Sequence, residues 1–440
     1  MMRKRVYVAL LITVCAGILF ACGPKESAPD AGSASDPGPV KKVQVSKDPV
    51  TLKFLIGAGI AMEEVEVLFM DPVKKKYPNI SFEVIRAGKG SQLIDLIGAG
   101  NIPDLVMSDN TNIGSSYDYG VLFDHTELIR MLGINLERLD PVVVNGVRDA
   151  LGDGLIYGLP YFQQFNALYY NKDIFDKFGV SYPKDGLTWD ETVELARRLT
   201  RQDGGVQYKG LHYENVYRLA MPLSPDFVDR VSLKATVNNE MWKKVFDLGY
   251  RINNIPGNKP PRVDNGYTNA FFKEKNTAML ATTSILGTFR DTIRDGFNLG
   301  VAQYPSYPER PNTYGFVSAG MVYVTKTSKH KNEAMLMLKE MMSDEVQLLA
   351  SRKYARKTIL QNPDVDRQFG KDLEGLSNID LQSAFKSKAA PAPAFTQYTA
   401  SARRLVMSKY IEFIEGKGDM NTALRAAEEE INKMIEAEKK

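Results

Sequence analysis

The chain beyond residue 50 alternates short β-branched apolar runs with longer stretches of helical periodicity. The first strand candidate is "VTLKFLI", the helical stretch "MEEVEVLFMDPVKKKY" follows it, and the second strand candidate is "ISFEVI". A further helix candidate, "SQLIDLIGAG", precedes a third strand candidate, "DLVMS". Strands separated by helices in this way predict a parallel sheet in an α/β layer.

Ligands of parallel sheets bind beyond the carboxyl ends of the strands. The pattern therefore predicts binding loops at residues 57–62 and 109–115. A different stretch, "LPYFQQFNALYYN" at residues 159–171, packs five aromatic residues into thirteen positions. It fits a buried strand as well as a surface that stacks on a flat apolar ligand, and composition leaves both interpretations open.

Three further helices are predicted from their apolar periodicity. "GLTWDETVELARRLT" has Thr188 near its start and Glu191 three positions later, which predicts a capping box. "KNEAMLMLKEMM" and "NTALRAAEEEINKMIEAE" have the pattern of amphipathic helices. The methionines of the former are expected in the core rather than in a metal or partner site.

The N-terminus has the pattern of a signal peptide. "MMRKRVYVALLITVCAGILFACG" places basic residues before an apolar run and small residues around a cysteine. The apolar run of about 15 residues is shorter than the roughly 20 that span a membrane. "LFAC" resembles the lipobox of bacterial lipoproteins, so residues 1–21 are predicted to be removed and Cys22 to be lipidated, which would hold the protein at a membrane. Residues 22–49, rich in Gly, Pro and Ser, are predicted to be a flexible tether.

Charge and cysteine content narrow the functional class. The full chain has a formal net charge of +3, and the predicted signal contributes three basic residues and no acid, so the remainder is formally neutral. No strong field favours nucleic acid or acidic lipid as a partner. No cysteine follows Cys22, so the folded part has no disulfide and must depend on a sizeable hydrophobic core.

Motifs for catalysis, cofactors and metals are weak. His125, His212 and His330 stand outside any His-Glu-x-x-His pattern, so a structural or surface role is expected for each, least clearly for His212 because "LHYENVY" has the composition of a loop. "AGKGSQ" lacks the P-loop spacing, and "GAGIAM" has Met62 in place of the third glycine of a dinucleotide fingerprint. A carboxylate pair for glycoside hydrolysis stays open, but no pair is singled out. No catalytic residue, metal ligand or cofactor is predicted.

Seven segments occur in an order that resembles the family 1 extracellular solute-binding proteins of ABC sugar importers, which includes the maltose-binding-like lipoproteins. They are "KKYPNISFEVI", "GAGNIPDLVMSD", "YDYGVLFD", "GLIYGLPY", "ALYYNKDIFDKFGVSYPKDGLTWDE", "FKEKNTAML" and "GFVSAGMVYVTKTSKHKNEAMLML". The resemblance covers the chain from about Thr51 to Glu436, and residues 157–191 are its most specific part.

The resemblance implies an α/β, two-lobed fold of the periplasmic-binding-protein type (type II). Each lobe would be a mostly parallel sheet flanked by helices, with the ligand cleft between the lobes and a hinge closure on binding. The N-terminal lobe would comprise residues 50–160 and 318–360, and the C-terminal lobe residues 161–317 and 361–440. Residues 159–171 would then form the first crossover between lobes.

The resemblance also implies cleft residues. Carboxylates, amides and arginine suit the hydroxyls of a sugar, and aromatic faces suit its apolar ring faces. The first strand lacks the Trp that often follows it in the family, and Ile285 stands where related members carry a stacking aromatic, so Tyr and Phe residues are the expected substitutes, with a core role equally open for each. The implied ligand-binding residues are Gly59, Asp109, Asn110, Asn112, Tyr161, Phe162, Gln164, Tyr213, Thr283, Ser284, Phe289, Ser318, Gly320, Gln397 and Arg403.

The sequence thus predicts a monomeric solute-binding protein, lipid-anchored through Cys22 on the extracytoplasmic face of the cell membrane. It would capture a carbohydrate, expected to be an oligosaccharide, and deliver it to the permease subunits of an ABC transporter. The alternatives are a surface glycoside-processing enzyme, a binding protein for a non-sugar solute such as a polyamine, and a sensor that presents a sugar to a membrane kinase.

Overall fold

The computed structural model describes residues 46–259, 267–376 and 379–438, which all belong to one compact unit, Lys41–Lys440. The predicted signal peptide, Cys22 and nearly all of the predicted tether lie outside the described residues. Within the described residues, no helix combines the length and apolarity needed to cross a membrane.

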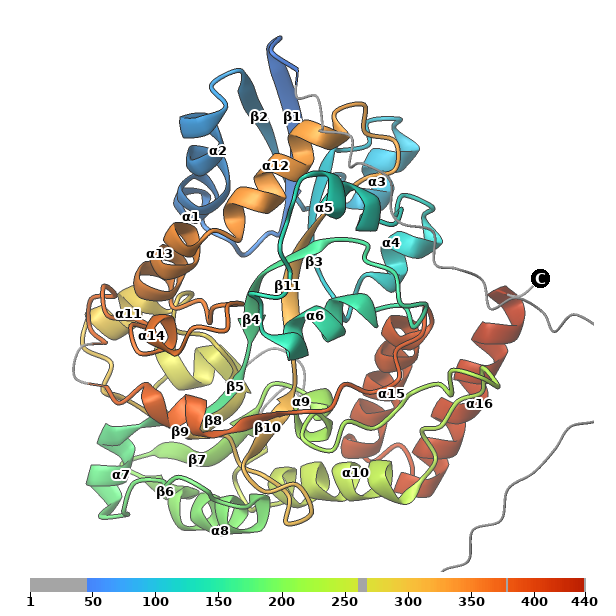
Figure 1. Ribbon diagram of the computed structural model, residues 1–440. Helices are drawn as coiled ribbons and strands as arrows, with labels where there is room; N and C mark the ends of the chain where they lie inside the picture. Colours follow the sequence, from blue (N-terminus) through green and yellow to red (C-terminus); the bar gives the residue numbers. More distant parts are fainter. Residues whose placement is uncertain (1–45, 260–266, 377–378, 439–440) are drawn as a thin grey trace, which may run out of the picture. The chain divides into compact units, whose positions relative to one another are not determined.

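The first sheet contains five strands in the order β2-β1-β3-β11-β4, drawn in the upper part of Figure 1. β1 pairs in parallel with β2 and β3, so the parallel α/β arrangement predicted from the sequence is confirmed. β11 returns from far along the chain and pairs antiparallel with both β3 and β4. The strands are β1 (Val50–Ile56), β2 (Ile80–Arg86), β3 (Leu105–Asp109), β4 (Leu159–Gln164) and β11 (Ser318–Val324).

The second sheet also contains five strands, in the order β6-β7-β8-β5-β9, in the lower part of Figure 1. β7 and β8 run parallel, while β6 pairs antiparallel with β7, and β5 pairs antiparallel with β8 and β9. This sheet is therefore mostly antiparallel, and the prediction of a mostly parallel sheet in each lobe was wrong for it. A separate parallel pair joins β10 to β12. The strands are β5 (Asn166–Asn171), β6 (Arg201–Asp203), β7 (Val206–Tyr213), β8 (Thr277–Thr283), β9 (Leu299–Gln303), β10 (Thr313–Phe316) and β12 (Lys388–Ala390).

Helices connect the strands in both regions. Around the first sheet they are α1 (Met62–Val65), a π-helical turn (Glu66–Met70), α2 (Asp71–Lys76), α3 (Leu93–Gly98), α4 (Gly114–Asp118), α5 (Thr126–Met131), α6 (Pro141–Arg148), α12 (Lys331–Met341) and α13 (Asp344–Tyr354). The others are α7 (Lys172–Phe178), α8 (Trp189–Leu199), α9 (Val216–Ala220), α10 (Glu240–Asn253), a second π-helical turn (Asn269–Lys273), α11 (Arg290–Arg294), α14 (Pro363–Asp366), a 3₁₀ turn (Gln382–Lys386), α15 (Thr399–Ile414) and α16 (Met420–Glu438).

The predicted capping box at the start of α8 is confirmed. The Thr188 Oγ1 accepts a hydrogen bond from the Glu191 backbone N–H at 3.3 Å, and the Glu191 Oε2 accepts one from the Thr188 N–H at 2.8 Å. This reciprocal pair satisfies two backbone donors that the first helical turn would otherwise leave free.

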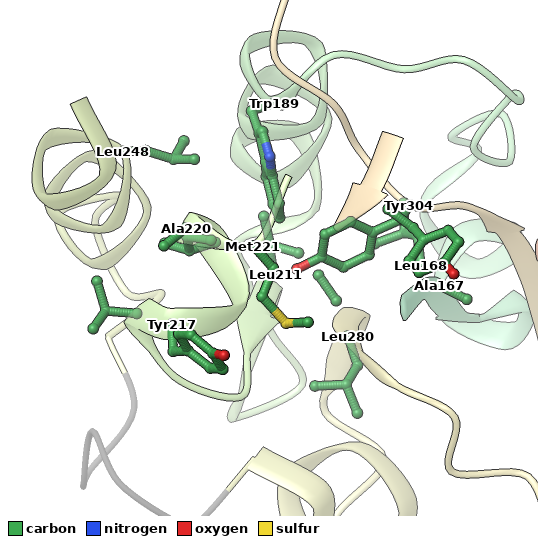
Figure 2. Packing of buried hydrophobic residues seen from close by; sticks show 14 of the residues in the cluster. Ala167, Leu168, Trp189, Leu211, Tyr217, Ala220, Met221, Leu248, Leu280 and Tyr304 are labelled. Carbon is green, nitrogen blue, oxygen red and sulfur yellow. The ribbon is translucent and has the colours of Figure 1, made fainter. Parts of the chain in front are cut away.

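The buried apolar side chains form two separate clusters, one around each sheet. The first takes in the methionines of α12, among them Met335, Met337 and Met341, so their predicted core position is confirmed. The second contains both tryptophans, Trp189 and Trp242, and Figure 2 shows its inward-turned side chains around Trp189, Met221 and Tyr304. Two independent cores are what two α/β layers need in order to fold without disulfides.

The aromatic stretch at residues 159–171 passes from one sheet to the other. Its first half is β4, the edge strand of the first sheet, and its second half is β5, a central strand of the second. All but one of the residues in the two strands are buried. The composition left open a buried strand or a ligand-facing surface, and each applies to one half of the stretch. β4 ends at the cavity described below, whereas β5 builds the second core.

One buried histidine lies at each sheet. The His125 Nδ1 contacts the Phe123 carbonyl at 2.9 Å, and the Val324 N–H donates to its Nε2 at 3.0 Å, which fits a neutral ring. Burial lowers the pKa of His125 to about 4. His212 lies within strand β7, so the expectation of a loop there was wrong, and burial lowers its pKa to about 3. His330 immediately precedes α12.

Candidate ligand-binding site

A cavity of about 380 Å³ opens where the ends of β3, β4 and β11 meet the segment after β7 and the start of α15. One wall thus belongs to the first sheet and the other to elements packed around the second. The lining residues are Ser108, Asp109, Thr111, Asn112, Tyr161, Phe162, Gln164, Glu214, Asn215, Tyr217, Arg218, Ser318, Gly320, Arg403 and Met407.

The loop after β3 is organised by the Asp109 carboxylate. Its Oδ1 accepts hydrogen bonds from the Thr111 N–H at 2.9 Å and the Thr111 hydroxyl at 2.5 Å. Its Oδ2 accepts one from the Asn112 Nδ2 at 2.6 Å. An aspartate commonly stabilises a turn by bonding the backbone two residues on. Here the turn also fixes the two side chains that face Arg403.

Strands β4 and β11 supply the adjoining part of the first wall. Phe162 and Gly320 are paired across the strands, and a Cβ on Gly320 would lie 2.1 Å from the Phe162 Cε1. Only glycine fits there, because the ring lies directly against the backbone. At the end of β4, the Gln164 Oε1 accepts a hydrogen bond from the Thr283 hydroxyl at 2.6 Å, which links the two sheets beside the cavity.

The opposite wall begins where β7 ends, with an acid–base pair. Asn215 caps α9, and the turn brings Glu214 and Arg218 together, with the Arg218 Nε 2.6 Å from the Glu214 Oε2. The Thr282 hydroxyl donates to the same oxygen at 2.9 Å. Burial alone would raise the pKa of the Glu214 carboxyl, but the charge and hydrogen bonds of Arg218 more than offset this and lower it. Glu214 is therefore ionised and its charge is balanced.

Arg403, near the start of α15, connects the two walls. Its Nη1 donates to the Thr111 Oγ1 at 3.1 Å, and its Nη2 donates to the Asn112 Oδ1. Its guanidinium carbon lies 4.9 Å from the centroid of the Tyr217 ring. Within the described part of the chain, no carboxylate forms an ion pair with Arg403. The guanidinium is held by neutral groups and an aromatic face, so it keeps donors for a ligand.

The charges in the cavity balance, since Asp109 and Glu214 oppose Arg218 and Arg403. Amides from Asn112, Gln164 and Asn215 and hydroxyls from serine and threonine lie among them. A site of this kind offers acceptors and donors side by side. A hydroxyl group, which donates one hydrogen bond and accepts others, is the ligand group best matched to it.

Eight of the residues predicted from the sequence line this one cavity, although they come from four separate parts of the chain. They are Asp109, Asn112, Tyr161, Phe162, Gln164, Ser318, Gly320 and Arg403.

Three other predicted residues are engaged elsewhere. Asn110 is buried, donating to the Gly146 carbonyl at 3.1 Å and accepting from the Ala319 N–H at 2.9 Å, so its amide ties β3 to its neighbours. Tyr213 places its hydroxyl between Tyr410 and Asn253 in the second core. Phe289 stacks on Phe272 with ring centroids 4.1 Å apart. None of the three lines the cavity.

The remaining four also lie outside the lining. Gly59 is exposed in a loop whose carbonyls accept from Arg86. Thr283 contacts Gln164 rather than the cavity, and the Ser284 N–H donates to the Phe165 carbonyl at 2.9 Å. The carbonyl of Gln397 packs against Gly114, where a Cβ would lie 2.6 Å away.

The sequence interpretation missed the acid–base pair and its neighbours. Glu214, Tyr217 and Arg218 all follow β7, and the first two lie in the segment "LHYENVY" that was interpreted as a loop. The signal that was available is the spacing of Glu214 and Arg218, four residues apart and directly after a strand of a parallel pair. The other lining residues that were not predicted are Ser108, Asn215 and Met407, while Thr111 lies within the binding loop predicted at residues 109–115.

Comparison with known families identifies the class of protein. The profile of the bacterial extracellular solute-binding proteins matches residues 60–348, which is more than half of the chain. The chain therefore belongs to that family, and the family predicted from the sequence is confirmed. The family name also places its members outside the cytoplasm.

Curated relatives are similar over part of their length. A putative binding protein of Brucella abortus is 27% identical over 199 residues, which are 42% of this chain and 46% of the relative. An arabinooligosaccharide-binding protein of Halalkalibacterium halodurans is 26% identical over 200 residues, 41% of this chain and 42% of the relative. A mannitol-binding protein of Pseudomonas aeruginosa is 28% identical over 156 residues, 32% of this chain and 35% of the relative. The matched region thus spans less than half the length of these relatives.

Solved structures show the same fold over nearly their whole length. An ABC substrate-binding protein of Listeria monocytogenes in complex with cycloalternan has a TM-score of 0.71 at 18% identity, covering 88% of this chain and 99% of that one. A solute-binding protein of Thermotoga lettingae bound to α-D-tagatose has a TM-score of 0.71 at 18% identity, covering 87% of this chain and 99% of that one. The predicted two-lobed, type II periplasmic-binding fold is confirmed.

Proposed function

We propose that this protein binds a carbohydrate in the cavity between its two sheets and delivers it to the permease of an ABC transporter. The observation that carries the proposal is the charge-balanced lining, which contains carboxylates, guanidinium groups and amides. Such a lining satisfies the mixed donor and acceptor character of sugar hydroxyls, whereas a polyamine would need an excess of carboxylates.

The names of similar proteins support the same ligand class. Among the curated relatives one is an arabinooligosaccharide-binding protein and another a mannitol-binding protein. Structures of the same fold contain cycloalternan and tagatose. These ligands share a high density of hydroxyl groups and differ in size.

The lobes are proposed to follow the division predicted from the sequence, residues 50–160 with 318–360 and residues 161–317 with 361–440, with one change. Residues 161–164 complete strand β4 of the first sheet, so we assign them to the first lobe. The separate apolar clusters around the two sheets support this division. Because the cavity walls belong to different lobes, a ligand that contacts both walls would favour the closed arrangement. Closure is driven only by the difference in the ligand's affinity for the two arrangements.

The proposed location is the outer face of the cell membrane, where Cys22 would carry the lipid anchor and the protein would act as a monomer. The support is the lipobox-like "LFAC" after an apolar run. A Cys22→Ser variant is expected to leave the membrane fraction, since the acyl chains provide the attachment.

A ligand panel tests the proposal. Purified protein is titrated by calorimetry and thermal shift with mono- and oligosaccharides, sugar alcohols and, for comparison, polyamines. A ligand at 100 times its Kd adds about 2.7 kcal/mol of stability. Asn112→Ala, which removes an exposed cavity amide, should raise the Kd about tenfold. Asn254→Ala, an equally exposed residue at the end of α10, serves as the matched control.

Two results would contradict the proposal. One is a stability increase with a polyamine and with no carbohydrate. The other is release of shorter products from a bound saccharide, detected by chromatography, because that would show catalysis rather than capture.

A further inference from the structure

We propose that the cavity recognises a short ligand of one or two sugar units by its hydroxyl groups and not by stacking on its ring faces. Arg403 determines this mode of recognition, because it covers the Tyr217 ring and offers hydrogen-bond donors to hydroxyl groups. The inference rests on the proposed carbohydrate function and narrows it to a ligand class and a mode of recognition.

The aromatic side chains of the first wall offer almost no free face. Tyr161 is 8% exposed and Phe162 is 7% exposed. The Tyr161 ring packs edge-on against Phe69, with ring centroids 5.0 Å apart, and is tilted against Phe162, with ring centroids 4.6 Å apart. The Arg356 guanidinium lies 5.0 Å from the centroid of the Phe162 ring. A sugar ring needs an uncovered aromatic face for stacking, and these two rings do not provide one.

Arg356 is not free to leave Phe162. Its Nε and Nη2 donate to the two oxygens of Glu64 at 2.7 and 2.9 Å, and Glu64 is buried. A two-pronged bond between a buried carboxylate and a mostly buried guanidinium holds the guanidinium in one orientation. The cover over Phe162 is therefore permanent.

Tyr217, the aromatic side chain of the opposite wall, is 8% exposed and is covered by Arg403. The Arg403 guanidinium is held over the ring by Thr111 and Asn112, and both of these are oriented by Asp109. A chain of contacts therefore extends from the first wall to the ring of the second. The Arg403 guanidinium thus occupies the face of the Tyr217 ring on which the apolar face of a sugar would otherwise stack.

Hydrogen bonds from the polar groups of the cavity provide the binding energy that ring stacking would otherwise contribute. A hydroxyl that donates to a carboxylate can accept from a neighbouring guanidinium, and the cavity has a carboxylate on each wall and two guanidinium groups on the second. The planar fork of a guanidinium suits two adjacent hydroxyls better than a single point charge does. Densely hydroxylated, short ligands make the greatest number of such contacts.

The volume agrees with a short ligand. The cavity of about 380 Å³ lies near the lower end of the range of about 300 to 1,000 Å³ typical of small-molecule sites. One or two sugar units fill such a space.

The test is whether replacing Arg403 raises or lowers the Kd for the ligand. In Arg403→Gln, loss of the guanidinium is expected to raise the Kd for a hexose, a hexitol or a disaccharide by about tenfold to a hundredfold, because charged hydrogen bonds are lost. If stacking governed binding, the same variant would uncover Tyr217 and leave the Kd unchanged or lower. Arg404→Gln is the matched control, since Arg404 lies next on α15, is exposed and contacts Ser401.

A second measurement needs no variant and covers the case in which Arg403→Gln fails to fold. Wild-type protein is titrated with single-deoxy analogues of its best ligand and with a series from monosaccharide to pentasaccharide. The inference expects several deoxy analogues to bind about tenfold more weakly and affinity to stop rising after two units. It is overturned if binding requires three or more units or if the deoxy analogues bind as well as the parent. Binding of no carbohydrate at all would instead overturn the proposed function itself.

Discussion

The wall that follows β3 and the wall that follows β7 both present a carboxylate to the cavity, but they hold it in different ways. Asp109 accepts hydrogen bonds from neutral groups of its own loop. Glu214 is paired with the Arg218 guanidinium, and their side chains are only 20% and 15% exposed. The first wall is thus a locally stabilised turn, and the second is a nearly buried ion pair. Damage to the second should cost stability, and damage to the first should cost binding.

Acidification is expected to have the largest effect on the free energy of unfolding, and it acts through a buried histidine at each of the two sheets. His125 and His212, one at each sheet, are neutral in the fold with pKa values lowered to about 4 and about 3. In the unfolded chain each titrates near 6.5, so the unfolded state takes up protons first and stability falls as the pH drops from 6.5 towards 4. The loss should reach about 3 kcal/mol per histidine.

Chemical denaturation measured at intervals between pH 7 and pH 4 tests this expectation. His125→Gln should flatten the dependence by about half. The Glu214 carboxyl has a lowered pKa, so its contribution is present above about pH 4.5 and is lost only below it. A stability that stays constant down to pH 4.5 would contradict the assignment of neutral, buried histidines.

Removing one member of the ion pair should have the next largest effect. Arg218→Met leaves the Glu214 carboxylate without its partner and is expected to destabilise the protein by about 3 kcal/mol in urea denaturation. The double variant Glu214→Gln with Arg218→Met removes both charges and should recover most of that loss. A single variant within 1 kcal/mol of the wild type would show that the pair is solvated rather than buried.

The smallest effect on stability is expected at the first wall. Asp109→Asn removes one acceptor oxygen from the turn and should cost only about 1 kcal/mol. Because Thr111 and Asn112 then lose their fixed orientation towards Arg403, the Kd for the ligand should still rise about tenfold. Calorimetry and urea denaturation of the same variant separate the two quantities. A stability loss as large as that of Arg218→Met would remove the distinction between the walls.

The sequence was most informative where structure is local. The order of β1 to β3, the capping box at Thr188 and the buried methionines of α12 depend on neighbouring residues, and all are found as predicted. The wall after β3 was also found, since Asp109 ends a strand that the pattern predicted.

Two of the errors at the site, at Asn110 and Tyr213, concern the direction in which a side chain points. Successive side chains at the end of a strand turn to opposite sides. Asp109 and Asn110 are adjacent, and only the first faces the cavity, while Asn110 is used to join β3 to β11. In the same way Tyr213 enters the second core and Glu214 faces the cavity. The sequence does not reveal this direction, because it depends on partners more than a hundred residues away.

Gly320 sets a limit on how this site can diverge in evolution. Its backbone forms part of the first wall against Phe162, and any side chain there would push the ring towards Arg356, which is bonded to Glu64. One substitution at this position would disturb three residues together, so selection should remove it. Descendants of this protein that acquire new ligands are therefore expected to change at the opposite wall, at Arg403 or Tyr217, while the glycine persists.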